Sequence, residues 1–317
     1  MPADLIVIGA GSAGLVAART AAALGGRVTL VEADRIGGDC TWTGCIPSKA
    51  FIHEAAGAYQ AGTGAGPAGE SAAFTHVQRA IKAVYERESP EELARAGIEV
   101  VAGTARFRDR TTLEVGSAVL TAPRILVCTG AAPAPPPIEG LAEVDYLTYR
   151  NVFELARLPE SLIILGGGPI GVELAQAFSR LGSDVTLVEA AARLVPIADP
   201  DASGLIAQVL ARAGGLVHPG HTVATRGHGA GAAAERAGLG PREARASDPS
   251  VRAVVSARRK RSFTGVLQAD GAARETVHRL VVRARVVRNV GAARPDPAGP
   301  PVPRPSLPEP TPADVVA

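Results

Sequence analysis

Residues 5–33 read LIVIGAGSAGLVAARTAAALGGRVTLVEA, and residues 162–190 read LIILGGGPIGVELAQAFSRLGSDVTLVEA. The two stretches are a repeat, and their last six residues, VTLVEA, are identical. Each copy begins with a short apolar run, which is typical of a parallel strand buried on both faces. A glycine-rich turn, a helical stretch and a second apolar run follow in each copy. The repeat therefore predicts two β-α-β units within an α/β fold.

The glycines of each copy have the spacing of a dinucleotide-binding turn. In the first copy they are Gly9, Gly11 and Gly14, and an acid, Glu32, closes the second strand. The first glycine permits the turn, the second lets the backbone approach a pyrophosphate, and the third lets helix pack on strand. The acid binds the ribose hydroxyls, and the helix N-terminus attracts the phosphates. A lone turn of this kind is weak evidence, but two complete units favour two dinucleotides, most simply one flavin and one hydride carrier.

Two of the three cysteines lie shortly after the first copy, in residues 37–49, GGDCTWTGCIPSK. The spacing of Cys40 and Cys45 is compatible with the first turn of a helix, where a thiol ionises more readily than a free thiol. A thiolate beside an oxidised cofactor can donate electrons. The alternatives are a zinc half-site and two buried cysteines. Zinc needs two more ligands, and Cys128 and His53 are each isolated.

This segment resembles the active-site signature of the class I pyridine nucleotide-disulfide oxidoreductases, which include dihydrolipoamide dehydrogenase, glutathione reductase and mercuric reductase. The sequence CTWTGCIPSK is most similar to that of the mercuric-reductase-like branch, and the resemblance covers roughly residues 3–225. It implies two Rossmann-like domains, an FAD-binding domain over residues 1–148 and an incomplete NAD(P)-binding domain over 149–235. It also implies electron transfer from NAD(P)H through FAD and the cysteine pair to a small disulfide or a thiol-bound metal ion.

The resemblance gives individual residues their roles. Cys45 is expected to contact the flavin, Cys40 to meet the substrate, and Lys49 to lie near the flavin and pair with Glu173. The expected FAD ligands come from the first copy, the cysteine segment and two later turns: Gly9, Gly11, Ser12, Ala13, Gly14, Glu32, Ala33, Gly38, Asp39, Lys49, Thr104, Ala105, Thr129 and Gly130. The expected nicotinamide-dinucleotide ligands come from the second copy: Gly166, Gly168, Pro169, Ile170, Gly171 and Glu189.

Three residues have further expected roles. Glu189 is expected to bind the free 2′-hydroxyl of NADH and to repel the 2′-phosphate of NADPH, so NADH is the expected coenzyme. Arg193 follows closely and would soften that preference. Cys128 stands where the family often has alanine, and we expect a small buried residue there rather than a third redox thiol.

The composition of the whole chain excludes several other classes. A net charge of +2 in 317 residues indicates no nucleic-acid or membrane partner. The apolar start over residues 5–18 has no basic residue before it and is interrupted by glycines, so it is not typical of a signal peptide. It is also shorter than the ~20 residues of a membrane helix. With no secreted disulfide framework, we expect a cytoplasmic protein.

The chain changes character in its last third. Residues 215–317 hold 16 of the 33 basic residues but only 8 of the 31 acidic residues, and residues 295–312 include nine prolines. We expect residues 236–317 to be an atypical basic, Pro/Arg-rich tail that is disordered. The basic run at 258–261 would also suit a nucleic-acid partner, but a solvated segment is the simpler interpretation.

Parts that the resemblance leads one to expect are not found in the sequence. The family is homodimeric, but its interface domain, with a His and Glu dyad, has no counterpart, and His218 and His221 come too early to replace it. The extra cysteines of mercury chemistry are also missing, which argues against Hg(II) as substrate. A change of reading frame near residues 214–240 is one hypothesis. The alternatives to a disulfide reductase are a truncated, non-catalytic fragment and a flavin NADH oxidase or diaphorase.

Overall fold

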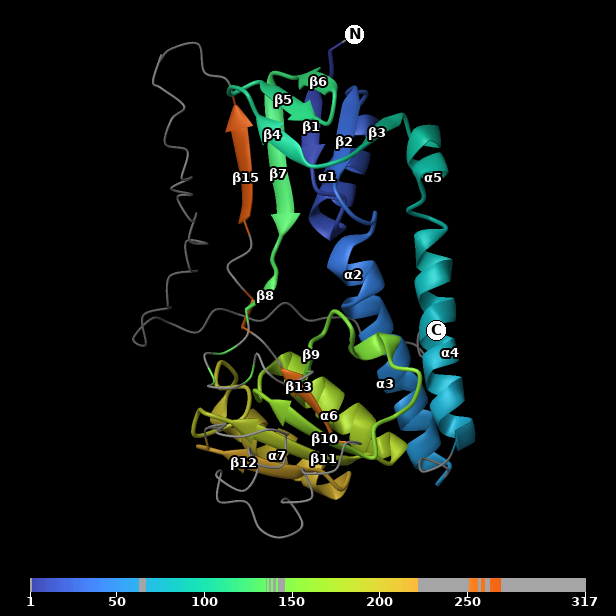
Figure 1. The fold of residues 1–317 in the computed structure, drawn as a ribbon, viewed down its shortest axis with the longest axis vertical. Coiled ribbons are helices and arrows are strands. Elements are labelled where there is room, and N and C mark those ends of the chain that lie inside the picture. Colours follow the sequence, from blue (N-terminus) through green and yellow to red (C-terminus); the bar gives the residue numbers. More distant parts are fainter. Residues whose placement is uncertain are drawn as a thin grey trace, which may run out of the picture. The chain divides into compact units, whose positions relative to one another are not determined.

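The structure is a computed structural model that describes residues 2–62, 67–134, 136, 138, 141, 146–221, 251–255, 258–259 and 263–268. These residues fall within one compact unit, residues 1–275. They form two five-stranded sheets with helices packed against them (Figure 1). The predicted α/β class with two Rossmann-like units is confirmed, whereas the domain boundaries near residues 148 and 235 stay predictions. In this part of the chain no helix is both long and apolar enough to cross a membrane.

The first repeat builds the first sheet, which has the strand order β15-β7-β1-β2-β3. Strands β7, β1, β2 and β3 are parallel to one another, and β15 is antiparallel to β7. The strands are β1 (Leu5–Ile8), β2 (Val28–Glu32), β3 (Ile98–Ala102), β7 (Arg124–Gly130) and β15 (Phe263–Gln268).

The second repeat builds the second sheet, which has the order β12-β11-β10-β13-β9 and is parallel throughout. Its strands are β9 (Tyr146–Leu147), β10 (Ser161–Leu165), β11 (Asp184–Glu189), β12 (Leu216–Pro219) and β13 (Val251–Val255).

The helices connect and cover these strands. They are α1 (Ser12–Ala23), α2 (Gly38–Trp42), α3 (Cys45–Gln60), α4 (Pro67–Tyr85), α5 (Pro90–Arg95), α6 (Pro169–Leu181) and α7 (Pro200–Arg212), with a 3₁₀ turn at Val152–Glu154. Two small antiparallel sheets complete the described fold: β4 (Ala105–Phe107), β5 (Thr112–Val115) and β6 (Ala118–Thr121) form one, and β8 (Pro133–Ala134) and β14 (Arg258–Arg259) the other.

Three short strands lie within residues 236–317, the segment predicted to be a tail. Strand β13 pairs with β10 and β9 in the second sheet, β14 pairs with β8, and β15 pairs with β7 in the first sheet. These strands were not predicted from the sequence, because a strand is selected by the partners it pairs with as much as by its own residues. The rest of the predicted tail lies outside the described residues.

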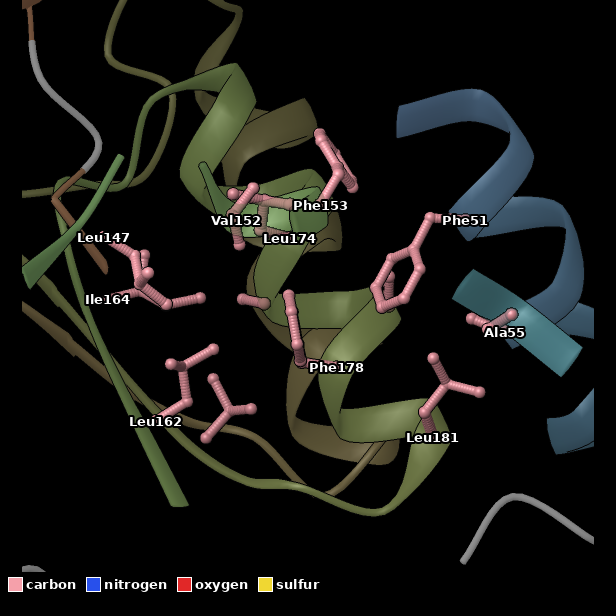
Figure 2. Close-up of a cluster of buried hydrophobic side chains, with 14 of the residues drawn as sticks. Phe51, Ala55, Leu147, Val152, Phe153, Leu162, Ile164, Leu174, Phe178 and Leu181 are labelled. Carbon is pink, nitrogen blue, oxygen red and sulfur yellow. The ribbon is translucent and has the colours of Figure 1, made fainter. Parts of the chain in front are cut away.

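A cluster of aromatic side chains joins helix α3 to helix α6 and to the 3₁₀ turn at Val152–Glu154. Phe51 of α3 lies with its ring centroid 4.9 Å from that of Phe178 of α6 and 5.9 Å from that of Phe153 (Figure 2). Phe51 and Phe178 are fully buried, and burying a side chain of this size stabilises a fold by roughly 1.5–3 kcal/mol. The cluster therefore fixes α3, which begins at Cys45, against α6.

Candidate functional site

The first glycine turn is closed by the acid at the end of β2. The φ of Gly9 is +99°, a conformation that favours glycine, and its N–H donates to the carbonyl of Val31 at 2.7 Å. Glu32 Oε2 accepts from the Ala10 N–H at 2.5 Å. Helix α1 then begins after Gly11 without a side-chain cap. Its first N–H groups are therefore oriented toward a site that an anion can occupy.

The second turn repeats this arrangement. The Gly166 N–H donates to the carbonyl of Val188 at 2.8 Å, and Glu189 Oε2 accepts from the Gly167 N–H at 2.6 Å. Helix α6 begins after Gly168, again without a side-chain cap. The sequence repeat is thus also a repeat of backbone and carboxylate geometry.

The third glycine of each turn has a packing role. A Cβ atom on Gly14 would lie 1.8 Å from the Gly9 carbonyl oxygen, and one on Gly171 would lie 1.9 Å from that of Gly166. Neither contact is possible, so only glycine lets these helices pack so closely on the preceding turn. Gly14 is accordingly not among the residues that line the cavity described next.

A cavity of about 580 Å³ lies along the first turn and extends to both cysteines of the motif, Cys40 and Cys45. Most of the residues expected to bind FAD line it together. They are Gly9, Gly11, Ser12, Ala13, Glu32, Ala33, Gly38, Asp39, Thr104, Ala105, Thr129 and Gly130. The uncapped start of α1, the acid at the end of β2 and the close backbone approach of the glycines fit the phosphates and ribose of a dinucleotide.

Both cysteines of the motif line this cavity. Cys45 is the first residue of the 16-residue helix α3, where the free N–H groups of the helix favour a thiolate. Cys40 lies in the short helix α2 before it. Thr43 and Gly44 join the two helices, and a Cβ atom on Gly44 would lie 2.7 Å from the Asp39 carbonyl oxygen. A glycine at this position therefore keeps the two cysteine helices close together.

Lys49 lies one turn after Cys45 on α3, and its Nζ is 2.8 Å and 2.9 Å from the two carboxylate oxygens of Glu173. Glu173 belongs to α6, in the second repeat. The structure thus brings together the two residues that the resemblance pairs. Lys49 is not among the residues that line the cavity, so its expected proximity to the flavin stays a prediction.

Cys128 behaves differently from the other two thiols. It is 6% exposed in β7, and burial raises the pKa of its thiol. A raised pKa keeps this thiol protonated at neutral pH, and a protonated thiol is a poor nucleophile. This agrees with the expectation of a small buried residue.

Several side chains of the cavity were not identified from the sequence. The Arg35 guanidinium lies 4.7 Å from the ring centroid of Trp42, whose indole N–H donates to the carbonyl of Ile36 at 2.7 Å. Arg150, far along the chain, also lines the cavity. Trp42 lies inside the cysteine motif, so its place in the cavity could have been predicted from the sequence. Nothing in the sequence around Arg150 links that residue to the cavity.

Comparison with known proteins extends this description. A family model described as pyridine nucleotide-disulphide oxidoreductase matches residues 3–244. Mercuric reductase of Streptomyces lividans is 39% identical over 229 residues, which are 68% of this chain and 48% of that protein. Dihydrolipoyl dehydrogenase 2 of Haloarcula marismortui is 35% identical over 216 residues, which are 64% of this chain and 46% of that protein. The chain thus spans less than half the length of these relatives.

A solved structure is also similar. The flavoprotein disulfide reductase RclA of Escherichia coli, which is HOCl-induced, matches with a TM-score of 0.62 and 31% identity over 70% of this chain and 50% of that one. Its Cu(II) complex matches with a TM-score of 0.66 and 26% identity over 82% of this chain and 57% of that one.

Proposed function

The chain belongs to the pyridine nucleotide-disulphide oxidoreductase family, and on that premise we propose that it is an FAD-dependent NAD(P)H:disulfide oxidoreductase. One observation supports this most directly. Cys40 and Cys45 line the same cavity as the first glycine turn, the Glu32 carboxylate and the Thr129–Gly130 end of β7. A dinucleotide in that cavity would therefore have a redox-active pair beside it.

Different residues of the cavity would bind different parts of the dinucleotide. The start of α1, with Gly11 and Ser12, would hold the phosphates, and Glu32 would accept hydrogen bonds from the adenosine ribose. Bound FAD would supply two-electron transfer from a reduced nicotinamide to the disulfide form of the cysteine pair. Cys45, at the N-terminus of α3, would be the thiol next to the flavin.

Cys40 would then react with the substrate. Its thiolate attacks one sulfur of a substrate disulfide. A mixed disulfide between Cys40 and the substrate forms, and the first substrate thiol is released. Cys45 attacks the Cys40 sulfur of that mixed disulfide, releases the second substrate thiol and restores the Cys40–Cys45 disulfide. The net change is one substrate disulfide reduced to two thiols at the expense of one NAD(P)H and one proton. A small disulfide is the first substrate class to test, and a thiol-bound soft metal ion is the second.

The full chain, supplied with FAD, is expected to show flavin absorbance and to reduce an aromatic disulfide such as 5,5′-dithiobis(2-nitrobenzoate) with NADH or NADPH. Replacing Cys45 by serine removes one of two thiols that act as a unit, so the rate should fall roughly a thousandfold or more. The release of the coloured thiol product is measured.

Cys128→Ala is the matched control, because it removes the third thiol that lines the cavity, which lies in β7 and not in the cysteine motif, and it should retain the rate. A protein that takes up no flavin would contradict the proposal. Equal rates for Cys45→Ser and the parent chain would point instead to a diaphorase that bypasses the cysteines.

We further propose that NADH is the preferred coenzyme. The Glu189 carboxylate is held at the end of β11, where it accepts from the N–H groups of Gly167 and Ala191 at 2.6 Å and 2.7 Å. Arg193 is engaged elsewhere, since its guanidinium donates to Ser203 Oγ at 3.0 Å and to the carbonyls of Ala198 and Pro196. A 2′-phosphate would therefore meet a fixed carboxylate, while Arg193 is already hydrogen-bonded to the loop before α7 and to Ser203.

NADH is accordingly expected to bind at least about tenfold more tightly than NADPH, which corresponds to ~1.4 kcal/mol. The dissociation constants of both coenzymes are measured by nicotinamide fluorescence. Glu189→Gln should narrow the difference, whereas Glu154→Gln, an exposed acid outside this turn, should leave it unchanged. Tighter binding of NADPH by the parent chain would contradict the proposal.

A further inference from the structure

A charged cluster lies beside the redox cysteine Cys40 and is not explained by the functions described above. Asp39 precedes Cys40 in α2 and receives two side chains from the connection that follows β9. The Tyr149 hydroxyl donates to Asp39 Oδ2 at 2.9 Å, and Arg150 Nη2 lies 3.6 Å from Asp39 Oδ1. This connection is 110 residues away along the chain, so the contact is a product of the tertiary fold.

The segment that carries Arg150 is well ordered by its own hydrogen bonds. The Thr148 N–H donates to Asn151 Oδ1 at 2.7 Å, and the Asn151 N–H returns to the Thr148 carbonyl at 3.2 Å. Tyr149 is 4% exposed, and burial raises the pKa of its hydroxyl, which keeps it a proton donor at neutral pH. The backbone at Arg150 is thereby fixed before any ligand binds.

The cluster adjoins the turn where phosphates are expected. Gly37 donates its N–H to the Ala10 carbonyl at 2.8 Å and forms a parallel bridge with Gly11. A Cβ atom on Gly38 would lie 2.8 Å from the Cα of Gly11. The start of α2, and Asp39 with it, therefore lies directly against the start of α1.

Charge makes Arg150 the significant member of the cluster. Besides the three cysteine thiols, the ionisable side chains that line the cavity are three carboxylates and two guanidinium groups: Glu32, Asp34, Asp39, Arg35 and Arg150. Arg35 lies over the Trp42 ring. A pyrophosphate entering this cavity meets one more carboxylate than guanidinium group. Without Arg150, two carboxylates would have no guanidinium group to balance them. The side chain of Arg150 is half exposed and contacts Asp39 through one of its nitrogens, so several of its five N–H donors can still reach a ligand.

We propose that Arg150 binds the pyrophosphate of the dinucleotide in this cavity, and that Asp39 and Tyr149 are positioning residues that hold its guanidinium there. The inference rests on the proposed FAD site. It adds to that site a cation from the connection between the two repeats. Binding of the cofactor would thus also tie this connection to the cysteine helix.

The test measures the affinity of the full-length chain for FAD, through quenching of flavin fluorescence, without any assay of activity. Losing one charge-assisted contact should make Arg150→Gln bind FAD about tenfold more weakly. Arg157→Gln is the control, because Arg157 is an exposed arginine nearby that does not line the cavity. Asp39→Asn should weaken binding less than Arg150→Gln does, and it should add no loss in the Arg150→Gln background, since Asp39 acts through Arg150.

Displacement of FAD by fragments separates a phosphate contact from a general change in the cavity. ADP should compete less well in Arg150→Gln than in the parent chain, whereas adenosine, which has no phosphate, should compete equally in both. Unchanged FAD affinity in Arg150→Gln would overturn the inference and leave the proposed function intact. Restoration of binding by Asp39→Asn in the Arg150→Gln background would also overturn it, because Arg150 would then only neutralise Asp39. A parent chain that binds no FAD would overturn both proposals.

Discussion

Gly14→Ala is expected to destabilise the chain by about 3 kcal/mol, the upper end of what overpacking costs, whereas Gly57→Ala is expected to stabilise it. Both glycines lie within helices, α1 and α3. A Cβ atom on Gly14 would lie 1.8 Å from the Gly9 carbonyl oxygen, but one on Gly57 would meet nothing within 4 Å. Because Gly9 is part of the first glycine turn, relief of the clash must move that turn.

The matched pair isolates the clash from helix propensity. Alanine at Gly57 should gain roughly 0.5–1 kcal/mol, since glycine is the poorer helix former. Urea unfolding followed by circular dichroism gives both free energies of unfolding, and a parallel FAD titration should show binding lost in Gly14→Ala and kept in Gly57→Ala. Equal stability of the two variants would mean that α1 does not pack on the turn as described.

The repeat units could be predicted from the sequence because their determinants are local. Gly9, Gly14 and Glu32 lie within one short stretch. Gly14 is required by its close contact with the Gly9 backbone, and Glu32 accepts from the Ala10 N–H, so both contacts lie inside that stretch. The same holds for Gly166, Gly171 and Glu189 in the second unit. The cysteine segment was equally accessible, since Cys40 and Cys45 belong to two consecutive helices joined by only two residues, Thr43 and Gly44.

Contacts between distant segments were not accessible in this way. Tyr149 and Arg150 lie in an irregular connection without hydrophobic periodicity, and only the folded chain brings them to Asp39. Arg193 shows that even a local contact of a long side chain can escape prediction. Its proximity to Glu189 in sequence suggested contact with a 2′-phosphate, but its guanidinium donates to the loop before α7 and to Ser203 of α7. A charge can be read from sequence, whereas the acceptor that a long side chain reaches depends on the fold.

Strand β13 shows the same limit for secondary structure. Its five residues, VRAVV, lie in an arginine-rich region that composition alone assigns to a tail. They become a strand because β10 and β9 offer parallel partners on both sides. In β10, Leu162 and Ile164 are fully buried, and without β13 that strand would lie at an edge of the sheet, with unpaired backbone groups. The pairing therefore predicts that residues after 250 stabilise the second repeat.

Val254→Pro tests this dependence and should destabilise the chain by roughly 3 kcal/mol, because proline in a central strand removes a ladder hydrogen bond and clashes with its neighbours. Val254 pairs with Ile164 of β10 on one side and with Leu147 of β9 on the other. The loss should appear in urea unfolding, and hydrogen exchange at β10 should accelerate. Val254→Ile keeps the N–H and the β-branched shape, so it should behave like the parent chain. If proline left both measurements unchanged, residues 251–255 would not be part of the sheet, and the second repeat would hold its buried strand β10 without them.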